Sequence, residues 1–565
     1  MKVNNQNKHF IQTLSPINTV SEEFAKAGTD ERGAVFTRRE VVDFILDLSG
    51  YVPSRKLQNL RLLEPSFGCG DFLIPAIERL MSSLKNQLVS PNVTTLKECI
   101  RAVELHAESF QKTRKEVYKI LNRYNLTTIQ IEELLNTWLI QGDFLLTEFD
   151  QLFTHVVGNP PYIRNEAVPS VLMTEYRKRF QTIYDRADIY VPFIEYSLSL
   201  LCEGGTLGFI CADRWMKNRY GGPLRKLIAE QYHLRIYVDM VGSSAFHSEV
   251  IAYPAITIIA KEPTGPTTII KRPEIDSTFL QEIFHTLKSD ATAKGVGVET
   301  TLVNSDDSPW MFGESSTLNL VRRLERDFPT LEEVGCKVGI GVATGADRVF
   351  IAQLGEMDVE EDRKIPLITT KDIQTGEINW KGYGVINPFD KKGKLVSLAE
   401  YPKLRAYLEL HRDIIEQRHI SKKNPHAWYR TIDRINIELV TRPKLLIPDI
   451  KSYVHIVYEK GKFYPHHNLY YITSQDWDLE SLSVILRSGI ARLFIETYST
   501  RMHGNCLRFQ AQYLRRIRIP HWSAIPDNIR QEIRRIAKKD DKVARNHIVS
   551  VLYSLSPTER AIIEK

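Results

Sequence analysis

The sequence predicts an α/β protein, in which a doubly wound, Rossmann-like domain precedes a C-terminal domain of mixed α+β structure. Strand-like and helix-like segments alternate between about residues 35 and 260. Such alternation is typical of a parallel sheet with helices on both faces. After about residue 262 the alternation weakens, and a region rich in aromatic and basic residues begins at 335.

The elements of the first domain follow from the spacing of apolar residues. Residues 38–51 and 71–84 have helical spacing, and residues 191–205 predict a helix closed by a glycine pair. Short apolar runs predict buried strands at 60–66, 100–105, 154–159, 206–212, 234–240 and 256–260. The Pro- and Thr-rich stretch 261–274 predicts that the chain leaves the sheet there, and 316–328 again has helical spacing.

A chain of 565 residues is too long for one ordinary hydrophobic core. We predict an N-terminal extension at 1–32, the doubly wound domain at 33–262, a connecting segment at 263–334 and the second domain at 335–565. Hydrophobic residues make up 43% of the chain and charged residues 25%, which is ordinary for a globular protein. The first thirty residues lack a signal-peptide pattern and no apolar run could span a bilayer, so we expect a cytoplasmic protein without a membrane partner.

Cysteine and histidine spacing argues against metal and disulfide sites. The six cysteines are scattered and form no C-x-x-C pair; they are Cys69, Cys99, Cys202, Cys211, Cys336 and Cys506. The adjacent pair His466–His467 has no cysteine or carboxylate at ligand spacing beside it. We interpret the pair as surface or contact residues and predict no metal site.

The net charge of +6 is unevenly distributed. Residues 331–565 contain 38 Lys and Arg against 29 Asp and Glu, which leaves 37 against 40 in residues 1–330. A near-neutral part joined to a basic part fits a catalytic module beside a module that binds a polyanion. Chance variation in composition explains the same difference, so charge alone does not decide.

Residues 64–70, EPSFGCG, lie between a predicted strand and a predicted helix. Glycines at this position let the backbone approach a ligand at the carboxyl edge of a sheet. The turn lacks the third glycine of a dinucleotide fingerprint and the Lys-Ser/Thr ending of a phosphate loop. A tight strand-to-helix turn also explains a bare G-x-G, but the preceding Glu-Pro makes the motif more specific.

Two further carboxylates, Glu104 and Asp143, lie downstream of this turn in the sequence. Glu104 ends the next strand, where a carboxylate can accept hydrogen bonds from both ribose hydroxyls of a nucleoside. Asp143 and Phe144 offer an acceptor beside an aromatic face, which suits an adenine ring. A solvated strand-end charge, a turn aspartate and a core phenylalanine remain alternatives at these positions.

Asn159-Pro160-Pro161-Tyr162 follows a predicted strand and is the most informative motif. Methylation of an aromatic amine is difficult because the nitrogen lone pair is delocalised into the ring. Two acceptors aimed at the amine hydrogens can free that lone pair, and the Asn159 side chain and Pro160 carbonyl can supply both. The prolines stiffen the loop, and Tyr162 can stack on a planar substrate. A structural Pro-Pro turn is the alternative.

These motifs, in this order, resemble the adenine-specific (N6) DNA methyltransferases of the TaqI-like, gamma-order class, which carry a C-terminal target-recognition domain and serve restriction-modification systems. The similarity covers about residues 33–260 and continues through segments 186–201, 204–216 and 241–259. It implies S-adenosylmethionine as the cofactor, whose methionine part would be held by Thr37, Glu64, Pro65, Gly68 and Gly70. Glu104 would bind the ribose and Leu105 the adenine, while Asp143 would accept from the adenine amine and Phe144 would pack on the ring.

The substrate that the resemblance implies is an adenine flipped out of double-stranded DNA. Asn159, Pro160 and Tyr162 would be catalytic, and Pro161 and Phe246 would contact the base, with Phe246 opposite Tyr162. Transfer would be a direct displacement from the sulfonium. The loop around Phe246 lacks the consecutive basic residues sometimes found there, which weakens that assignment.

The second domain resembles the target-recognition region of the same class in segments 339–351, 379–389, 442–450, 466–473 and 507–520. Basic residues can neutralise phosphates and aromatic residues can stack on bases. Two clusters are therefore candidate DNA contacts: Lys422, Lys423, Trp428, Tyr429 and Arg430, and Arg508, Arg515, Arg516 and Arg518. For each residue alone, a solvated surface position is the alternative.

Several other functions share part of this pattern. Protein-glutamine methyltransferases carry the same loop, but they are usually shorter and lack a basic C-terminal region. A fused nuclease would need an E-x-K motif, whereas Asp449 is followed by Glu459 and Lys462 in an E-x-x-K arrangement. The intact Asn159–Tyr162 loop and cofactor turn argue against a non-catalytic recognition subunit. Cytosine-N4 methylation stays as a chemical neighbour, because either amine could use the same two acceptors, although that chemistry more often has Ser or Asp in place of Asn159. We expect a monomer, and leave open a cognate restriction endonuclease acting as a separate chain.

Overall fold

The computed structural model describes residues 35–247, 254–288, 298–303, 306–312, 315–451, 454–499, 507–539 and 541–564, together with Val20. The chain forms two compact units, Met1–Phe312 and Gly313–Lys565. The boundary between them falls inside the stretch predicted to be a connecting segment. Apart from Val20, the predicted N-terminal extension at 1–32 lies outside the described residues.

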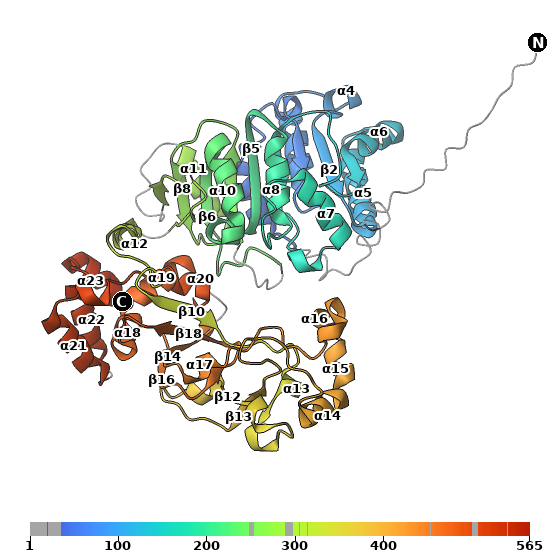
Figure 1. Ribbon diagram of the computed structural model, residues 1–565. Helices are drawn as coiled ribbons and strands as arrows, with labels where there is room; N and C mark the ends of the chain where they lie inside the picture. The colour runs from blue at the N-terminus through green and yellow to red at the C-terminus, as the bar shows by residue number, and fades with distance from the viewer. Residues whose placement is uncertain are drawn as a thin grey trace, which may run out of the picture. The chain divides into compact units, whose positions relative to one another are not determined.

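A nine-stranded sheet in the order β3-β2-β1-β4-β5-β7-β6-β8-β9 forms the centre of the first unit (Figure 1). Strands β3, β2, β1, β4 and β5 are parallel, whereas β7 is antiparallel to both of its neighbours. The strands are β1 Leu62–Glu64, β2 Ile100–Glu104, β3 Leu139–Gln141, β4 Phe153–Gly158, β5 Leu201–Ala212, β6 His233–Asp239, β7 Pro254–Ala260, β8 Thr267–Lys271 and β9 Val298–Thr301.

Helices cover both faces of this sheet, and their buried residues form two separate hydrophobic clusters. One cluster draws on α2 Arg39–Leu48, α3 Leu73–Asn86, α5 Ala107–Asn122, α6 Thr128–Trp138 and α11 Ser277–Lys288. The other draws on α7 Ser170–Arg179, α8 Tyr190–Ser199 and α10 Gly222–Gln231. Apolar residues recur at helical spacing in these segments, so each helix buries one face against the sheet. This arrangement confirms the predicted doubly wound fold.

Two predictions about the first unit are wrong. The chain does not leave the sheet at 261–274, because β8 pairs with β6 and β9 pairs with β8. The β-branched run Thr267-Thr268-Ile269-Ile270 outweighs the flanking prolines. The predicted helix over 191–205 ends at Ser199, and β5 starts at Leu201. The glycine pair Gly204–Gly205 therefore lies at an irregularity in β5, where the register to β4 shifts.

The order of the strands determines where a ligand can bind. Strand β1 pairs with β2 on one side and with β4 on the other, so the direction of winding reverses between β1 and β4. Loops that leave neighbouring strands on opposite faces open a crevice at such a switch point. The 64–70 turn follows β1 and the Asn159–Tyr162 loop follows β4. The sheet therefore brings the two motifs to one crevice.

The second unit has mixed α+β structure, as predicted. It contains two four-stranded sheets, in the orders β10-β18-β14-β16 and β11-β13-β12-β17. Their strands are β10 Cys336–Ile340, β18 Leu469–Ser474, β14 Lys444–Pro448, β16 Val457–Glu459, β11 Ile351–Gln353, β13 Tyr383–Ile386, β12 Lys364–Ile368 and β17 Tyr464–Pro465.

Along the chain, the helices of the second unit lie before, between and after these strands. They include α12 Ser315–Asp327, α14 Pro402–Leu410, α15 Arg412–Glu416, α16 His419–Lys423, α18 Leu479–Leu486, α19 Gly489–Tyr498, α21 Asp527–Ala537, α22 Lys542–Leu552 and α23 Pro557–Glu564. The segment predicted to be helical at 316–328 is α12. Within the described part of the chain, no helix has the length and apolar character needed to cross a membrane.

Candidate active site

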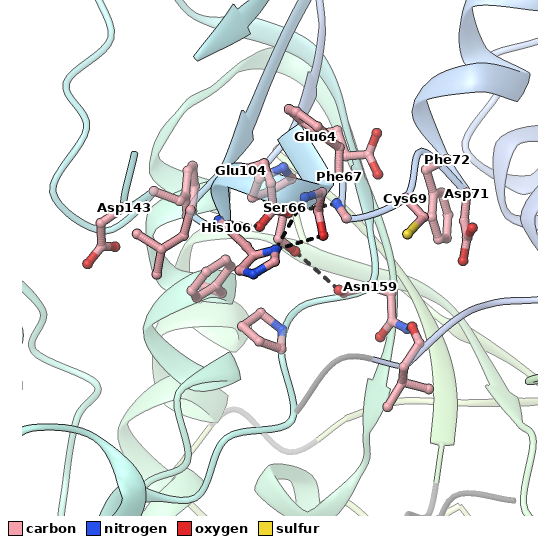
Figure 2. Close-up of a pocket in the computed structure, with 18 of the residues that line it drawn as sticks. Glu64, Ser66, Phe67, Cys69, Asp71, Phe72, Glu104, His106, Asp143 and Asn159 are labelled. Carbon is pink, nitrogen blue, oxygen red and sulfur yellow. Dashed lines mark hydrogen bonds between the residues drawn. The ribbon is translucent and has the colours of Figure 1, made fainter. Parts of the chain in front are cut away.

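A cavity of about 350 Å³ opens where β1, β2 and β4 end (Figure 2). Its lining includes most of the predicted site residues of the first unit: Thr37, Glu64, Pro65, Gly68, Glu104, Leu105, Asp143, Phe144, Asn159 and Pro161. Gly70, Pro160, Tyr162 and Phe246 do not line it. The residues come from segments more than 120 positions apart in the chain, from Thr37 to Pro161, and the sheet topology brings them together.

The turn after β1 depends on its two glycines. Gly68 and Gly70 have φ values of +51° and +90°, a conformation that side chains disfavour. A Cβ on Gly70 would also lie 2.9 Å from Ile74 Cδ1. The turn is closed by a hydrogen bond from the Gly70 amide to the Phe67 carbonyl (2.7 Å). Gly70 therefore shapes the cavity wall without lining it.

Glu104, at the end of β2, accepts hydrogen bonds from the turn after β1 and from the residue that precedes α5. The Gly68 amide donates to Glu104 Oε2 and the His106 amide donates to Oε1, both at 2.7 Å. A carboxylate oxygen can accept more than one hydrogen bond, and Glu104 lines the cavity. The side chain is thus held in one orientation at the middle of the site.

Glu64 is one of three carboxyl groups that lie close together in this part of the cavity, with Asp71 and Glu104. Its side chain is only 1% exposed, and Oε2 has no hydrogen-bond partner among the described residues. Burial raises the pKa of Glu64 well above its usual range, and the charges of Asp71 and Glu104 raise it further. Asp71 Oδ2 accepts a hydrogen bond from the Thr37 amide at 2.8 Å. A cationic group placed here would relieve the repulsion between these carboxylates.

Asp143 lies at the opposite end of the cavity from Asp71, with Glu104 between them (Figure 2). The Leu145 amide donates to Asp143 Oδ1 at 2.9 Å, and the Tyr176 hydroxyl donates to Oδ2 at 2.5 Å. Phe144 is buried against two rings, with centroid distances of 5.1 Å to Phe193 and 4.9 Å to Tyr196. This end therefore combines an anchored acceptor with an aromatic wall.

The nitrogen of the Asn159 side-chain amide has hydrogen-bond partners, whereas its oxygen has none among the described residues. Nδ2 donates to the Val35 carbonyl at 2.8 Å and to Thr37 Oγ1 at 3.2 Å, which fixes the orientation of the amide. Oδ1 is buried and has no hydrogen-bond partner among the described residues. The Ser66 hydroxyl donates to the Asn159 carbonyl at 3.2 Å and links this loop to the glycine turn. A buried acceptor without a donor costs free energy unless a ligand supplies one.

Tyr162, at the end of this loop, lies next to Phe246. Their ring centroids are 6.3 Å apart, and the rings meet edge to face at 83°. The backbone of Phe246 forms an antiparallel bridge with Thr37. Thr37 Oγ1 also accepts a hydrogen bond from Asn159 Nδ2. Since the rings are not parallel, one of them must turn before a planar base can lie between them.

Comparisons with known proteins identify the family to which the chain belongs. Residues 76–246 match the family described as Eco57I restriction-modification methylase, and residues 365–519 match the TaqI-like C-terminal specificity domain. The chain is 55% identical to the Type II methyltransferase M.PaeR7I of Pseudomonas aeruginosa, over 97% of this chain and 96% of that protein. The chain belongs to the Type II methyltransferases. Members of this family are DNA methyltransferases of restriction-modification systems, and the inferred resemblance to TaqI-like restriction-modification methylases is confirmed.

Two further relatives extend the comparison. The Type II methyltransferase M.XhoI of Xanthomonas vasicola is 49% identical and aligns over 94% of this chain and 99% of its own length. Among solved structures, the Type IIL restriction-modification enzyme MmeI in complex with DNA has a TM-score of 0.60 at 11% identity, and the match covers 97% of this chain and 75% of MmeI. That structural likeness supports the fold alone.

The first predicted DNA-contact cluster of this Type II methyltransferase is only partly exposed. Lys422 and Lys423 lie at the end of α16 and are exposed, and Arg430 is half-buried. Trp428 is only 7% exposed and packs in the core of the second unit, with the Arg412 guanidinium 4.8 Å from the centre of its ring. The prediction that Trp428 stacks on a base is wrong for this conformation, because its ring is covered by protein.

The arginines of the second cluster make contacts within the methyltransferase. Arg508 pairs with Asp449 at 2.5 Å, and Arg515 pairs with Glu332 at 2.8 Å. The Arg516 guanidinium lies 4.4 Å from the centre of the Tyr498 ring. Arg518 Nη1 lies 3.8 Å from Glu333 Oε2. Three of the four arginines are therefore paired with carboxylates of the same unit, which reduces what they can contribute to phosphate binding.

The structure also brings together side chains that are distant in sequence. His466 Nε2 lies 3.0 Å from Asp347 Oδ2, and His467 Nδ1 lies 4.0 Å from the same oxygen. Together these three side chains form a group whose ligand atoms lie within 4.8 Å of one another. Sequence spacing did not indicate a carboxylate beside the histidine pair, because Asp347 is 119 residues away.

The lining residues that sequence reasoning missed include Asp71, His106 and Tyr176. One signal was available, because Asp71 directly follows the predicted glycine turn. His106 follows Glu104 by two positions and caps the N-terminus of α5, where its ring accepts a hydrogen bond from the Ser109 amide at 3.2 Å. Tyr176 belongs to no motif, and only the tertiary structure places it beside Asp143.

Proposed function

We propose that this Type II methyltransferase transfers a methyl group from S-adenosylmethionine to the N6 amine of an adenine flipped out of DNA. The observation that carries the proposal is the Asn159 amide, whose Nδ2 is anchored while its buried Oδ1 has no donor within the described part of the chain. An exocyclic amine supplies that donor. Methyl transfer to such an amine needs the acceptor geometry that the anchored amide provides.

The cavity residues fit the proposed cofactor from end to end. Asp143 and the Phe144 ring suit an adenine, the Glu104 carboxylate suits ribose hydroxyls, and Glu64 with Asp71 suits a cationic methionine part. When bound, S-adenosylmethionine supplies an electrophilic methyl group on a sulfonium. The protein's own contribution is to orient the acceptor amine, exclude water and favour positive charge beside Glu64.

The residues of the substrate loop have distinct roles in this proposal. Asn159 Oδ1 and the Pro160 carbonyl accept the two amine hydrogens, so the nitrogen lone pair becomes available. Tyr162, Pro161 and Phe246 contact the base after the two aromatic rings have become parallel. Flipping is required because the amine of a paired adenine is engaged in the duplex.

We propose that the second unit reads the target sequence, with Lys422, Lys423, Arg430 and Arg516 as the candidate contacts among the predicted residues. Cleavage of unmodified DNA would belong to a separate endonuclease. In support, Glu459 is buried in an ion pair with Lys444, and Asp449 is paired with Arg508. We propose further that the protein acts as a monomer in the cytoplasm, where its DNA substrate lies.

Methylome sequencing of a host that expresses the chain tests this function. We expect N6-methyladenine in one short sequence motif throughout the genome. N4-methylcytosine in that motif would change the acceptor but keep the enzyme class. An unmodified genome together with a methylated protein glutamine would overturn the proposal.

The buried carboxylate predicts how cofactor binding depends on pH. Because the pKa of Glu64 is raised in the free protein, Glu64 keeps a proton at pH values where an exposed glutamate has lost it. A cationic ligand favours the ionised carboxylate, so binding releases a proton. The affinity for sinefungin, a stable cationic analogue, should therefore increase with pH by up to about tenfold per unit until the free-protein pKa is passed.

Calorimetry in buffers of different ionisation enthalpy measures this proton release directly. Glu64→Gln should bind sinefungin more weakly and remove the pH slope, while Glu108→Gln, a change on an exposed lining residue, should keep it. Binding to the unsubstituted protein without proton release would contradict the assigned role of Glu64.

A further inference from the structure

Tyr176 is a cavity-lining residue on a helix that contains none of the sequence motifs described above. It lies on α7, which begins at Ser170, eight residues after the substrate loop ends at Tyr162. Its ring is 3% exposed and packs in the second hydrophobic cluster together with Leu172 and Met173. Tyr176 nevertheless lines the cavity, and its hydroxyl donates to Asp143 Oδ2 at 2.5 Å.

The Asp143 carboxylate is held by donors on both of its oxygens. The Leu145 amide fixes Oδ1 and the Tyr176 hydroxyl fixes Oδ2. The backbone is fixed as well, because Thr147 Oγ1 donates to the Asp143 carbonyl at 2.7 Å. With both oxygens already engaged, the carboxylate can still accept one more hydrogen bond on its remaining lone pairs.

Loss of the tyrosine hydroxyl would affect this carboxylate in two ways. The side chain could rotate about the single remaining bond to Leu145. In addition, burial raises the pKa of Asp143, and the hydrogen bond from Tyr176 opposes that rise. Without it the neutral acid is favoured, and a neutral acid is a poorer acceptor than a carboxylate.

The position of α7 is itself well defined. Arg177 Nη2 donates to the Asp185 carbonyl at 2.7 Å, and Nη1 donates to the Ile183 carbonyl at 3.2 Å. These bonds fasten the end of the helix to the segment that leads into α8. The Tyr176 hydroxyl therefore reaches Asp143 from a rigid element, which is what accurate positioning of a ligand group requires.

We infer that Tyr176 is a positioning residue that fixes the Asp143 carboxylate as an acceptor, so that the cavity selects a purine carrying an exocyclic amine. The inference rests on the proposed cofactor, since it assigns the Asp143 end to the adenine of S-adenosylmethionine. In a ligand with a carbonyl in place of that amine, the carbonyl oxygen would face the Asp143 carboxylate. Two acceptors cannot form a hydrogen bond, so such a ligand would bind weakly.

The test measures this selection by calorimetry, using S-adenosylhomocysteine and its deaminated form, S-inosylhomocysteine. The unsubstituted protein should bind the adenosyl compound much more tightly. In Tyr176→Phe, we expect Kd for S-adenosylhomocysteine to rise about tenfold and Kd for S-inosylhomocysteine to change less than about twofold. The ratio of the two constants should thus fall about five- to tenfold.

Tyr196→Phe is the matched control. Its hydroxyl donates to the Thr147 carbonyl at 2.6 Å, and its ring packs on Phe144, but it does not contact the Asp143 carboxylate. We expect this variant to keep the ratio of the unsubstituted protein. An equal fall in both variants, or an unchanged ratio in Tyr176→Phe with an unchanged melting temperature, would overturn the inference. Failure of the unsubstituted protein to bind S-adenosylhomocysteine would instead overturn the proposed function.

Discussion

Asn159→Ala is expected to reduce kcat for DNA methylation by at least about 10²–10³-fold, with DNA and cofactor binding retained. The substitution removes the buried acceptor Oδ1, which has no partner of its own to lose among the described residues. Binding should persist because the cavity and the second unit keep their other groups. Single-turnover methylation with labelled S-adenosylmethionine measures the rate, and gel-shift and calorimetric titrations measure the two affinities.

Two further substitutions sharpen this experiment. Asn159→Asp keeps an acceptor, but its carboxylate would face the Val35 carbonyl, so we expect a rate between those of the unsubstituted protein and the alanine variant. Asn165→Ala changes an amide six residues further along the chain, whose Nδ2 makes contacts of 3.4 and 3.7 Å, and it should stay close to the unsubstituted rate. A normal rate in Asn159→Ala would remove Asn159 from the chemistry.

Glu104→Ala is expected to weaken cofactor binding by more than about 100-fold and to destabilise the first unit by about 3 kcal/mol. The carboxylate accepts from the amides of Gly68 and His106, so its loss leaves two donors at the cavity wall without a partner. The proposed contacts to the ribose are lost in the same step. Calorimetry with S-adenosylhomocysteine and thermal unfolding measure the two effects.

Glu104→Gln separates the two contributions. A glutamine retains one acceptor oxygen, so it should recover part of the stability but little of the cofactor affinity. Glu108→Ala provides the control, because Glu108 lines the same cavity from an exposed position on α5. Equal cofactor affinity in Glu104→Ala and Glu108→Ala would contradict the role of Glu104.

The strands and helices that position the site were predictable because each has a clear periodicity. β1, β2 and β4 are short buried apolar runs, and α2 and α3 have one apolar face. The errors arose where local composition opposed the tertiary structure. Prolines around 261–274 suggested an exit, but the β-branched residues of β8 complete the edge of the sheet. A glycine pair suggested a helix end, although it interrupts a strand.

The site was predictable to the extent that its residues belong to motifs at strand ends. Parallel strands bring their carboxyl ends to one edge, so Glu64, Glu104 and Asn159 could be grouped from the sequence. The contact of Tyr176 with Asp143 could not, since it depends on how α7 packs. The second unit was least predictable, because Trp428 and Arg508 have the composition of a nucleic-acid surface but are engaged within the fold.

Nucleoside mass spectrometry tests the central proposal most directly. Purified protein is incubated with unmodified DNA and S-adenosylmethionine carrying a deuterated methyl group, and the DNA is then digested to nucleosides. We predict deuteromethyl N6-methyldeoxyadenosine, which should be absent when Asn159→Ala is used. Label on N4 of deoxycytidine, or no labelled nucleoside from protein that binds both DNA and cofactor, would contradict the proposal.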